Sequence, residues 1–569
     1  MGIPVKEAQL RLFINGSPKT ILAAVCFGFI AILGAEAGSA TWKPHPHIPY
    51  WNQSASWDPE TVPNGPNDVA TFAVSFRLNV SVTTDESVNG IVFTPDASVF
   101  EIIVYQDLTL SGAGITNDSG ITQTFKPYPG ATISFINSAT AGSLTAFTNE
   151  GLIQFSNNSS SGSSAFDSWS STEFFDNATA GNSTFVNNGG GTNYNPAYGS
   201  VHFFGNASAA NGTFTNLAGI NLDHGGLIEF FDNSTAASGI FTSNGGSASI
   251  SSGGISFFDS STAGDGMFTN QGGTLSGVVG SVTQFSDTSS AANSTIIAND
   301  GVGPNSGASI QFFNDSVGGT SRLEIFGNGN LDVSAHNLPG VTIGSIEGDG
   351  MVLIGSQNLI TGSNDLSTTF SGLIQGTGTV TKIGTGNLTL TGANTYTGGT
   401  TVSGGILLAN NTNGSGTGTG PVQVTAGTFG GGGKVSGAVT VGTGGGLGAF
   451  LGPGATGIIP GTLTIRKKLT LMADATYKVT MNSSSVAADK VSAKGVKIGG
   501  AQILLDDRAA SVLPAGTVFT VINNTAATPI AGTFANLADG TTVIVGNNTF
   551  QANYEGGDGN DLTLTVVSL

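Results

Sequence analysis

Cysteine is almost absent from this chain of 569 residues, since Cys26 is the only one. It lies inside an apolar run at residues 20–33, so a chain cut after that run contains no cysteine. Disulfides, a common source of stability in small secreted proteins, are therefore excluded. Attachment of a lipid is the functional alternative for Cys26, but the preceding Val25 is larger than the small residue usual at that position.

Charge is also scarce, and positive charge most of all. Charged residues make up 9% of the chain, and 17 Lys and Arg face 36 Asp and Glu, which gives a formal net charge of −19. No Lys or Arg occurs between Lys126 and Arg322. This balance excludes nucleic-acid binding through phosphates and recognition of anionic lipids by a basic cluster. Glycans, divalent ions or extracellular proteins are the partners left open.

The first 37 residues are typical of a secretory signal peptide. Lys6, Arg11 and Lys19 precede the apolar run, and the small-x-small triplet at 35–37 follows it. The run is short for a spanning helix, which needs ~20 apolar residues. An uncleaved anchor is the alternative. We expect cleavage after residue 37, no membrane span afterwards, and a secreted or cell-surface location.

Glycine and phenylalanine are abundant, with 87 and 34 copies. Glycine with Ser, Thr and Asn is typical of flexible linkers, but here a phrase of two aromatic residues and a Gly/Asn-rich turn recurs at regular spacing. From Phe204 onward the first aromatic residue recurs after 27, 27, 27 and 28 residues. Such a period predicts a stack of repeats that bury their apolar faces on one another. The first aromatic positions are Phe135, Phe155, Phe175, Phe204, Phe231, Phe258, Phe285 and Phe313.

A second apolar residue follows ten positions later, at Phe185, Phe214, Phe241, Phe268 and Leu323. The segments between are rich in poor helix formers, and alternation at Phe76, Leu78, Val80 and Val82 predicts strands. We therefore expect an all-β chain in which both sets of aromatic residues form interior ladders. Identical side chains one coil apart would then lie ~4.8 Å apart.

A specific motif occupies residues 376–402. It reads GTGTVTKIGTGNLTLTGANTYTGGTTV, and a degenerate copy precedes it at 348–372. The motif resembles the autotransporter-associated β-strand repeat. This resemblance implies a right-handed parallel β-helix that is exported as a passenger or surface protein. Such passengers are normally followed by an outer-membrane barrel of ~10-residue strands, whereas this sequence stops after further short strands, so the export route is left open.

These observations predict five parts. Residues 1–37 form the signal peptide, 38–75 a Trp- and Pro-rich N-terminal cap, and 76–343 a β-helix with aromatic repeats. Residues 344–445 carry the autotransporter-associated repeats, and 446–569 form closing coils or a small β-domain. With ~20–27 residues per coil, the β-helix would extend on the order of 100 Å.

Two groups of residues are candidates for ligand contact. Trp42, Trp51 and Trp57 lie in the predicted cap, where they either pack as its core or form a platform that stacks on sugars. His45 and His47 form a His-x-His pair, but a metal site needs a third or fourth ligand and no Cys or acidic residue is close in sequence. We expect surface histidines there.

Two acidic patterns in the sequence are candidates for a site. Asp176, Asp232, Asp259 and Asp315 recur with the repeat and could line one face, as a polysaccharide lyase or hydrolase requires. Gly205 replaces the Asp in one copy and no cation accompanies them, so solvated turns are favoured. The segment 556–561 is similar to one calcium-binding nonapeptide, but such sites need tandem copies. A terminal turn is favoured there.

The sequence therefore predicts a right-handed parallel β-helix with an N-terminal cap and a β-rich closing region. The leading functional hypothesis is a non-enzymatic, adhesin-like surface or extracellular-matrix protein, with no catalytic residue, metal or cofactor. A carbohydrate-binding module is the second hypothesis, and a β-helical polysaccharide lyase or hydrolase is the third.

Overall fold

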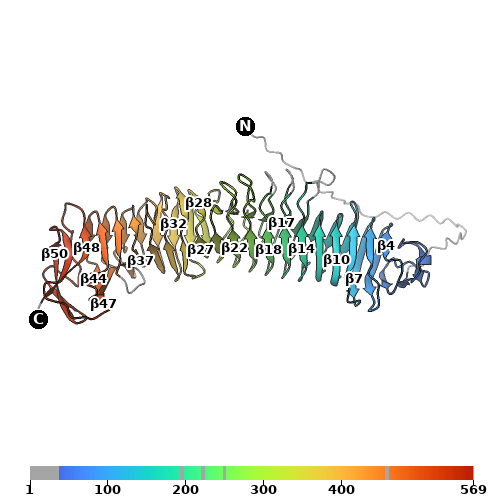
Figure 1. Cartoon of the computed structure of the whole chain (residues 1–569), viewed down its shortest axis with the longest axis horizontal. Coiled ribbons are helices and arrows are strands. Elements are labelled where there is room, and N and C mark those ends of the chain that lie inside the picture. The colour runs from blue at the N-terminus through green and yellow to red at the C-terminus, as the bar shows by residue number, and fades with distance from the viewer. Residues whose placement is uncertain are drawn as a thin grey trace, which may run out of the picture. The chain divides into compact units, whose positions relative to one another are not determined.

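Successive turns of the chain stack in order as a parallel β-solenoid of about 18 turns, which confirms the predicted fold. The computed structural model describes residues 38–191, 198–219, 224–247, 252–446, 448–454 and 460–567. The predicted signal peptide lies outside the described residues. Figure 1 shows the turns stacked from β4 near one end of the solenoid to β50 near the other.

The first long sheet has sixteen strands and runs from the N-terminal cap into the predicted repeat segment. All its pairings are parallel except that of β1 with β2. Its strands are β1 (Ala40–Trp42), β2 (Trp57–Asp58), β3 (Gly65–Phe72), β5 (Glu86–Phe93), β7 (Leu108–Asn117), β9 (Thr132–Phe135), β11 (Leu152–Phe155), β13 (Ser171–Phe174), β15 (Ser200–Phe203), β17 (Leu227–Phe230), β19 (Gly254–Phe257), β21 (Val282–Phe285), β23 (Ser309–Phe312), β25 (Asn330–Asp332), β28 (Met351–Gly355) and β31 (Leu373–Gly376).

The second long sheet runs almost the whole length of the described chain. Its strands are β4 (Asn79–Val82), β6 (Glu101–Val104), β8 (Gln123–Pro127), β10 (Ser143–Asn149), β12 (Ser163–Ser168), β14 (Thr184–Asn187), β16 (Thr213–Asn216), β18 (Ile240–Ser243), β20 (Met267–Asn270), β22 (Thr295–Ala298), β24 (Arg322–Ile325), β27 (Ser345–Gly348), β30 (Thr368–Phe370), β33 (Asn387–Leu390), β35 (Ile406–Ala409), β37 (Gly427–Gly431), β40 (Ala449–Pro453), β43 (Ala475–Asn482), β44 (Ala487–Ala488) and β47 (Gln502–Asp507).

Two further sheets complete the later turns. One contains β26 (Gly340–Ile343), β29 (Asn358–Thr361), β32 (Thr379–Lys382), β34 (Gly399–Val402), β36 (Val422–Val424), β39 (Val439–Val441), β42 (Leu469–Leu471) and β46 (Val496–Ile498). The other contains β38 (Lys434–Val435), β41 (Thr462–Ile465), β45 (Lys490–Ala493), β48 (Val518–Asn524), β49 (Thr542–Val545), β50 (Asn548–Gly556) and β51 (Asp561–Val567). Strands β48 to β51 pair antiparallel and end the stack.

Two rows of phenylalanine side chains run through the interior of residues 131–326, which we call the aromatic coils. Neighbouring rings of the first row stack with centroids 4.6–5.0 Å apart. Rings of the two rows meet edge to face, as at Phe230 and Phe241, where the centroids are 5.9 Å apart. The first row is Phe135, Phe155, Phe174, Phe203, Phe230, Phe257, Phe285 and Phe312, and the second is Phe147, Phe166, Phe185, Phe214, Phe241 and Phe268.

The first row corrects part of the predicted phase. Phe135, Phe155 and Phe285 are interior as expected. In the copies that contain two adjacent Phe residues, however, the buried ring is the first of the two, not the second as predicted. Phe257 rather than Phe258 pairs with Phe285, so the 27-residue step from Phe258 to Phe285 crosses from the outer position to the interior one. The expected second row is confirmed. The half-buried residues Phe175, Phe204, Phe231 and Phe258 form an outer Phe row, with centroids 5.0–5.1 Å apart, and Phe313 is half-buried too.

A polar ladder runs inside the same coils, at the end of the second-sheet strands. Asn187 Nδ2 donates to Asn216 Oδ1 at 2.9 Å, and Asn216 Nδ2 donates to Ser243 Oγ at 3.2 Å. Asn216 Nδ2 also donates to the carbonyl of Gly254 at 2.8 Å. These side chains are buried and satisfy backbone groups where the chain turns a corner.

Residues 340–431, which we call the repeat coils, have a mostly aliphatic core. Val380, Leu388 and Val402 are buried there. Lys382, at an inward position in register with Thr361 and Val402, is 1% exposed. Its ammonium donates to the carbonyl of Ile383, and burial lowers its pKa to about 8.

No helix among the described residues is long and apolar enough to cross a membrane. Within the described ranges, the one helical turn is the short 3-10 segment Ser54–Ser56 in the N-terminal cap.

Candidate functional site

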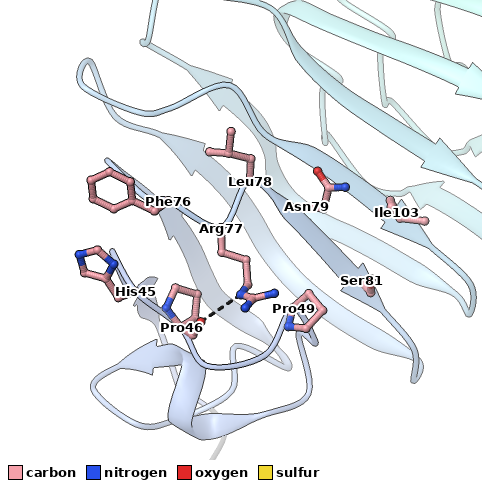
Figure 2. A pocket seen from close by; sticks show the side chains of 9 residues that line it. All are labelled: His45, Pro46, Pro49, Phe76, Arg77, Leu78, Asn79, Ser81 and Ile103. Carbon is pink, nitrogen blue, oxygen red and sulfur yellow. Dashed lines mark hydrogen bonds between the residues drawn. The ribbon is translucent and has the colours of Figure 1, made fainter.

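An open groove of about 730 Å³ lies beside the N-terminal cap, and we call it the N-terminal groove. The segment 45–49 forms one wall, and the other is the corner that leads from β3 into β4. Figure 2 shows aromatic rings at one end, Arg77 in the middle and small polar side chains at the other end. The lining residues are His45, Pro46, Pro49, Phe76, Arg77, Leu78, Asn79, Ser81 and Ile103.

The aromatic end is a stacked pair. The rings of His45 and Phe76 lie 8° from parallel with centroids 4.6 Å apart. Phe76 is 75% exposed, so its second face is open to solvent. The open face of such a ring offers an apolar surface on which a ligand can pack.

The polar part of the groove is held in place by backbone groups. Arg77 Nε donates to the carbonyl of Pro46 at 3.0 Å, and Arg77 Nη2 donates to that of His47 at 3.2 Å. The buried Trp42 donates from its indole to the carbonyl of Arg77 at 3.3 Å. The guanidinium therefore has a fixed position, and its remaining N–H donors are left for a ligand.

Two unpaired side chains face the same groove. Within the described part of the chain, neither the Asn79 amide nor the Ser81 hydroxyl has a recorded hydrogen-bond partner. Asn79 offers two donors and one acceptor, and Ser81 offers one donor and an acceptor. None of the nine lining residues is acidic, which distinguishes the groove from a chain of net charge −19.

The alternating apolar pattern in the sequence predicts the wrong orientation for Phe76, the aromatic ring of this groove. The pattern predicted that Phe76 and Leu78 point inward with Val80 and Val82, but only the two valines are buried. Strand β4 begins at Asn79, so Phe76 and Leu78 lie in the corner before it. The corner contains no Gly, Pro or Asn that would have marked it in the sequence.

The three tryptophans considered for glycan contact form the core of the cap. Trp42, Trp51 and Trp57 are each 0% exposed. Their rings meet edge to face at 5.0–5.1 Å, and Phe72 packs against all three. Sugar stacking needs an exposed ring face, so in this structure the tryptophans support the groove rather than line it.

The recurring aspartates lie in exposed turns between the two long sheets. Asp176, Asp232 and Asp259 have positive φ angles of 53–57°, which Asp tolerates better than most residues. Each carboxylate accepts the backbone N–H of the residue one coil earlier, as in Asp259 Oδ2 with Asp232 N at 3.1 Å. Asp287 occupies this position in the next coil, while Asp315 lies one residue past it. The turns therefore use these carboxylates to hold the coils together.

A second polar cluster lies on the outer face of the first sheet. Glu173, His202 and Glu229 are in register on β13, β15 and β17. His202 Nε2 lies 3.5 Å from Glu229 Oε2, and Ser171 Oγ lies 3.2 Å from His202 Nδ1. Burial lowers the pKa of His202 and raises that of Glu229. His202 therefore occupies the position between the two carboxylates.

The remaining candidates have structural roles. Gly556 and Asp561 pair across the β50–β51 hairpin, and Asp561 Oδ1 accepts the backbone N–H of Asn524 at 2.8 Å. His47 supplies a carbonyl to Arg77. No three His, Cys, Asp or Glu side chains converge as a metal site in the portion that the structure describes.

Comparison with known proteins confirms the predicted resemblance. Residues 380–409 match the family model of the passenger-associated transport repeat. These residues span the end of β32 and all of β33, β34 and β35. No curated protein sequence matches the chain.

A crystal structure of the Haemophilus influenzae Hap adhesin is a further similar structure. It shares 13% sequence identity at a TM-score of 0.24, and the match covers 87% of this chain. The chain spans 65% of the length of that adhesin chain.

Proposed function

We propose that this protein is an exported, non-enzymatic, adhesin-like scaffold that displays a binding surface outside the cell. The observation that carries the proposal is the continuity between the transport-repeat strands and the rest of the solenoid. Strand β33 pairs with β30 on one side and with β35 on the other, and β35 pairs in turn with β37. A segment typical of exported passengers is therefore built into the same stack as the turns before and after it.

The outer surface supports a scaffold better than an enzyme. The acidic residues that recur along it hold backbone groups of neighbouring coils. The half-buried carboxylates of Glu173 and Glu229 have His202 between them. The N-terminal groove is open and lacks acidic residues, so it is suited to binding and lacks the paired carboxylates that glycoside hydrolysis requires.

Export is tested by producing the full chain in a Gram-negative bacterium, beside a matched form that lacks residues 2–37. Fractionation and protease treatment of intact cells measure where each form lies. We expect the full chain outside the cytoplasm and the shortened form within it. Retention of both forms in the cytoplasm would contradict the proposal.

The scaffold role is tested separately with purified full chain. Polysaccharides and denatured proteins are incubated with it, and new reducing ends or peptides are measured. We expect neither product above the level of a heat-unfolded sample. Sustained release of either product would replace the scaffold with an enzyme.

A further inference from the structure

We infer that the N-terminal groove binds an acidic polysaccharide, with a sugar ring on the open face of Phe76 and a carboxylate on Arg77. This inference names a ligand class for the scaffold proposed above and rests on that proposed function. It concerns exposed residues of the corner before β4, rather than the tryptophans of the cap.

The aromatic pair supplies the apolar contact. The C–H groups on one face of a pyranose ring pack on an exposed aromatic ring, and burial of that area contributes favourable free energy. His45 covers one face of Phe76 at 4.6 Å and so holds the ring in one orientation. The other face is the exposed one.

The charge of the groove selects an anion. Arg77 is the one Lys or Arg in the lining, and two backbone carbonyls orient its guanidinium. A fixed guanidinium pairs well with a planar carboxylate. No lining residue is acidic, whereas the chain as a whole carries 36 Asp and Glu against 17 Lys and Arg. An acidic ligand is therefore attracted to the Arg77 end of the groove, while Glu101 lies in register beside Asn79 at the other end.

The groove also matches the hydroxyl groups of a glycan. Asn79 and Ser81 follow Arg77 along the wall, as Figure 2 shows, and their side chains can donate and accept at once. A volume of about 730 Å³ is within the range of small-ligand sites, and its openness suits a segment of a longer chain.

The test uses the full chain and two soluble probes of equal length, a galacturonate tetramer and neutral cellotetraose. Binding is measured by titration calorimetry at low and high salt. We expect the acidic tetramer to bind, at least tenfold weaker binding of the neutral tetramer, and a loss of affinity as salt screens the carboxylate contact.

Variants then locate the site. Phe76→Ala should weaken binding of the acidic tetramer at least tenfold, and Asn79→Ala several-fold, with unchanged melting temperatures. Ile544→Ala is the matched control, because Ile544 is 72% exposed on β49 near the other end of the stack. This control should bind as the unaltered chain does.

Three results would overturn the inference. They are no binding of the acidic tetramer, equal binding of both tetramers, or binding that Phe76→Ala leaves unchanged. None of them bears on export, since cell fractionation is a separate measurement. Export can therefore stand while the ligand assignment fails, and the reverse outcome is equally distinguishable.

Discussion

The aromatic coils and the repeat coils build the same solenoid with two different interiors. In the aromatic coils, buried positions hold stacked phenylalanine rings and an uncharged ladder of Asn and Ser. In the repeat coils they hold mainly Val, Leu and Ile, with single aromatic residues such as Phe370 and Tyr396 and the ammonium of Lys382. The fold therefore depends on the register of inward positions more than on which apolar residue fills them.

The two interiors differ in whether they bury an ionisable side chain. Among the described residues 131–326, the buried polar side chains are Ser, Thr and Asn, and none is ionisable. The repeat coils bury a lysine whose ammonium lies close to Gly362 and Gly405. Uncharged ladders cost little desolvation, whereas a buried ammonium costs several kcal/mol unless it is well paired. This contrast leads to four predictions.

The largest effect is expected from a pair of adjacent substitutions in the aromatic coils. Phe257→Asp places an unpaired carboxylate between stacked rings, and we expect a loss of more than about 4 kcal/mol and unfolding of the nearby coils. Phe258→Asp changes a half-buried ring of the outer Phe row, and its loss should be below about 2 kcal/mol. Thermal melting and hydrogen exchange measure both. Equal losses would show that the assigned phase of the two rings is wrong.

The second prediction concerns the charge buried in the repeat coils. Burial lowers the pKa of Lys382 from 10.5 to about 8, so the folded state binds its proton less tightly than the unfolded state. The resulting cost is fully present below pH 8 and disappears as pH rises through 10.5. Lys382→Met should therefore stabilise the protein at pH 7 by about 2–3 kcal/mol.

Melting curves at several pH values check this prediction. The gain from Lys382→Met should shrink between pH 8 and 10.5, because the unaltered lysine then loses its charge. Lys434→Met is the control, since Lys434 is less buried and donates to the carbonyl of Thr412. If Lys382→Met destabilises the protein at pH 7, the hydrogen bond to Ile383 outweighs desolvation.

Much of this contrast was predictable from the sequence, but some of it was not. The recurring aromatic phrase and the repeat motif predicted the stacked coils, because stacked repeats place equivalent apolar residues at the same inward positions. The motif also contains Lys382, but alternation alone does not tell an inward lysine from an outward one. In the Phe-Phe pairs, two adjacent aromatic residues satisfy the pattern equally well, so the choice depended on where each strand ended.

The candidate site was harder to predict than the fold. Phe76 continues an apparent strand pattern, and only the corner before Asn79 turns it outward. The tryptophans stood out in the sequence because they are rare, yet large aromatic residues are used in cores as readily as on surfaces. The groove depends on the segment 45–49 lying against residues 76–81, and that contact has no signal in local sequence.

The third prediction concerns the polar ladder inside the aromatic coils. Asn216→Leu removes the acceptor for Asn187 and the donor to Gly254, so buried backbone and amide groups lose partners. We expect a loss of about 1–3 kcal/mol. Asn216→Ser, which keeps a small polar group as Ser243 does, should lose less. An unchanged melting temperature in Asn216→Leu would mean that the ladder contributes nothing to stability.

The smallest effect is expected at an interaction that both regions contain, in which a turn Asp accepts a backbone N–H from a neighbouring coil. Asp259 in the aromatic coils accepts the N–H of Asp232, and Asp365 in the repeat coils accepts that of Thr385, which lowers the pKa of Asp365. The φ angles of Asp259 and Asp365 are 53° and 59°. Asp259→Asn keeps the acceptor and tolerates this conformation, so we expect a change within about 0.5 kcal/mol, whereas Asp259→Ala should cost about 1 kcal/mol. Urea unfolding measures the free energy of unfolding of Asp259→Asn and Asp259→Ala. Equal stability of the two variants would show that solvent replaces the carboxylate and that the coils are held together by their interiors alone.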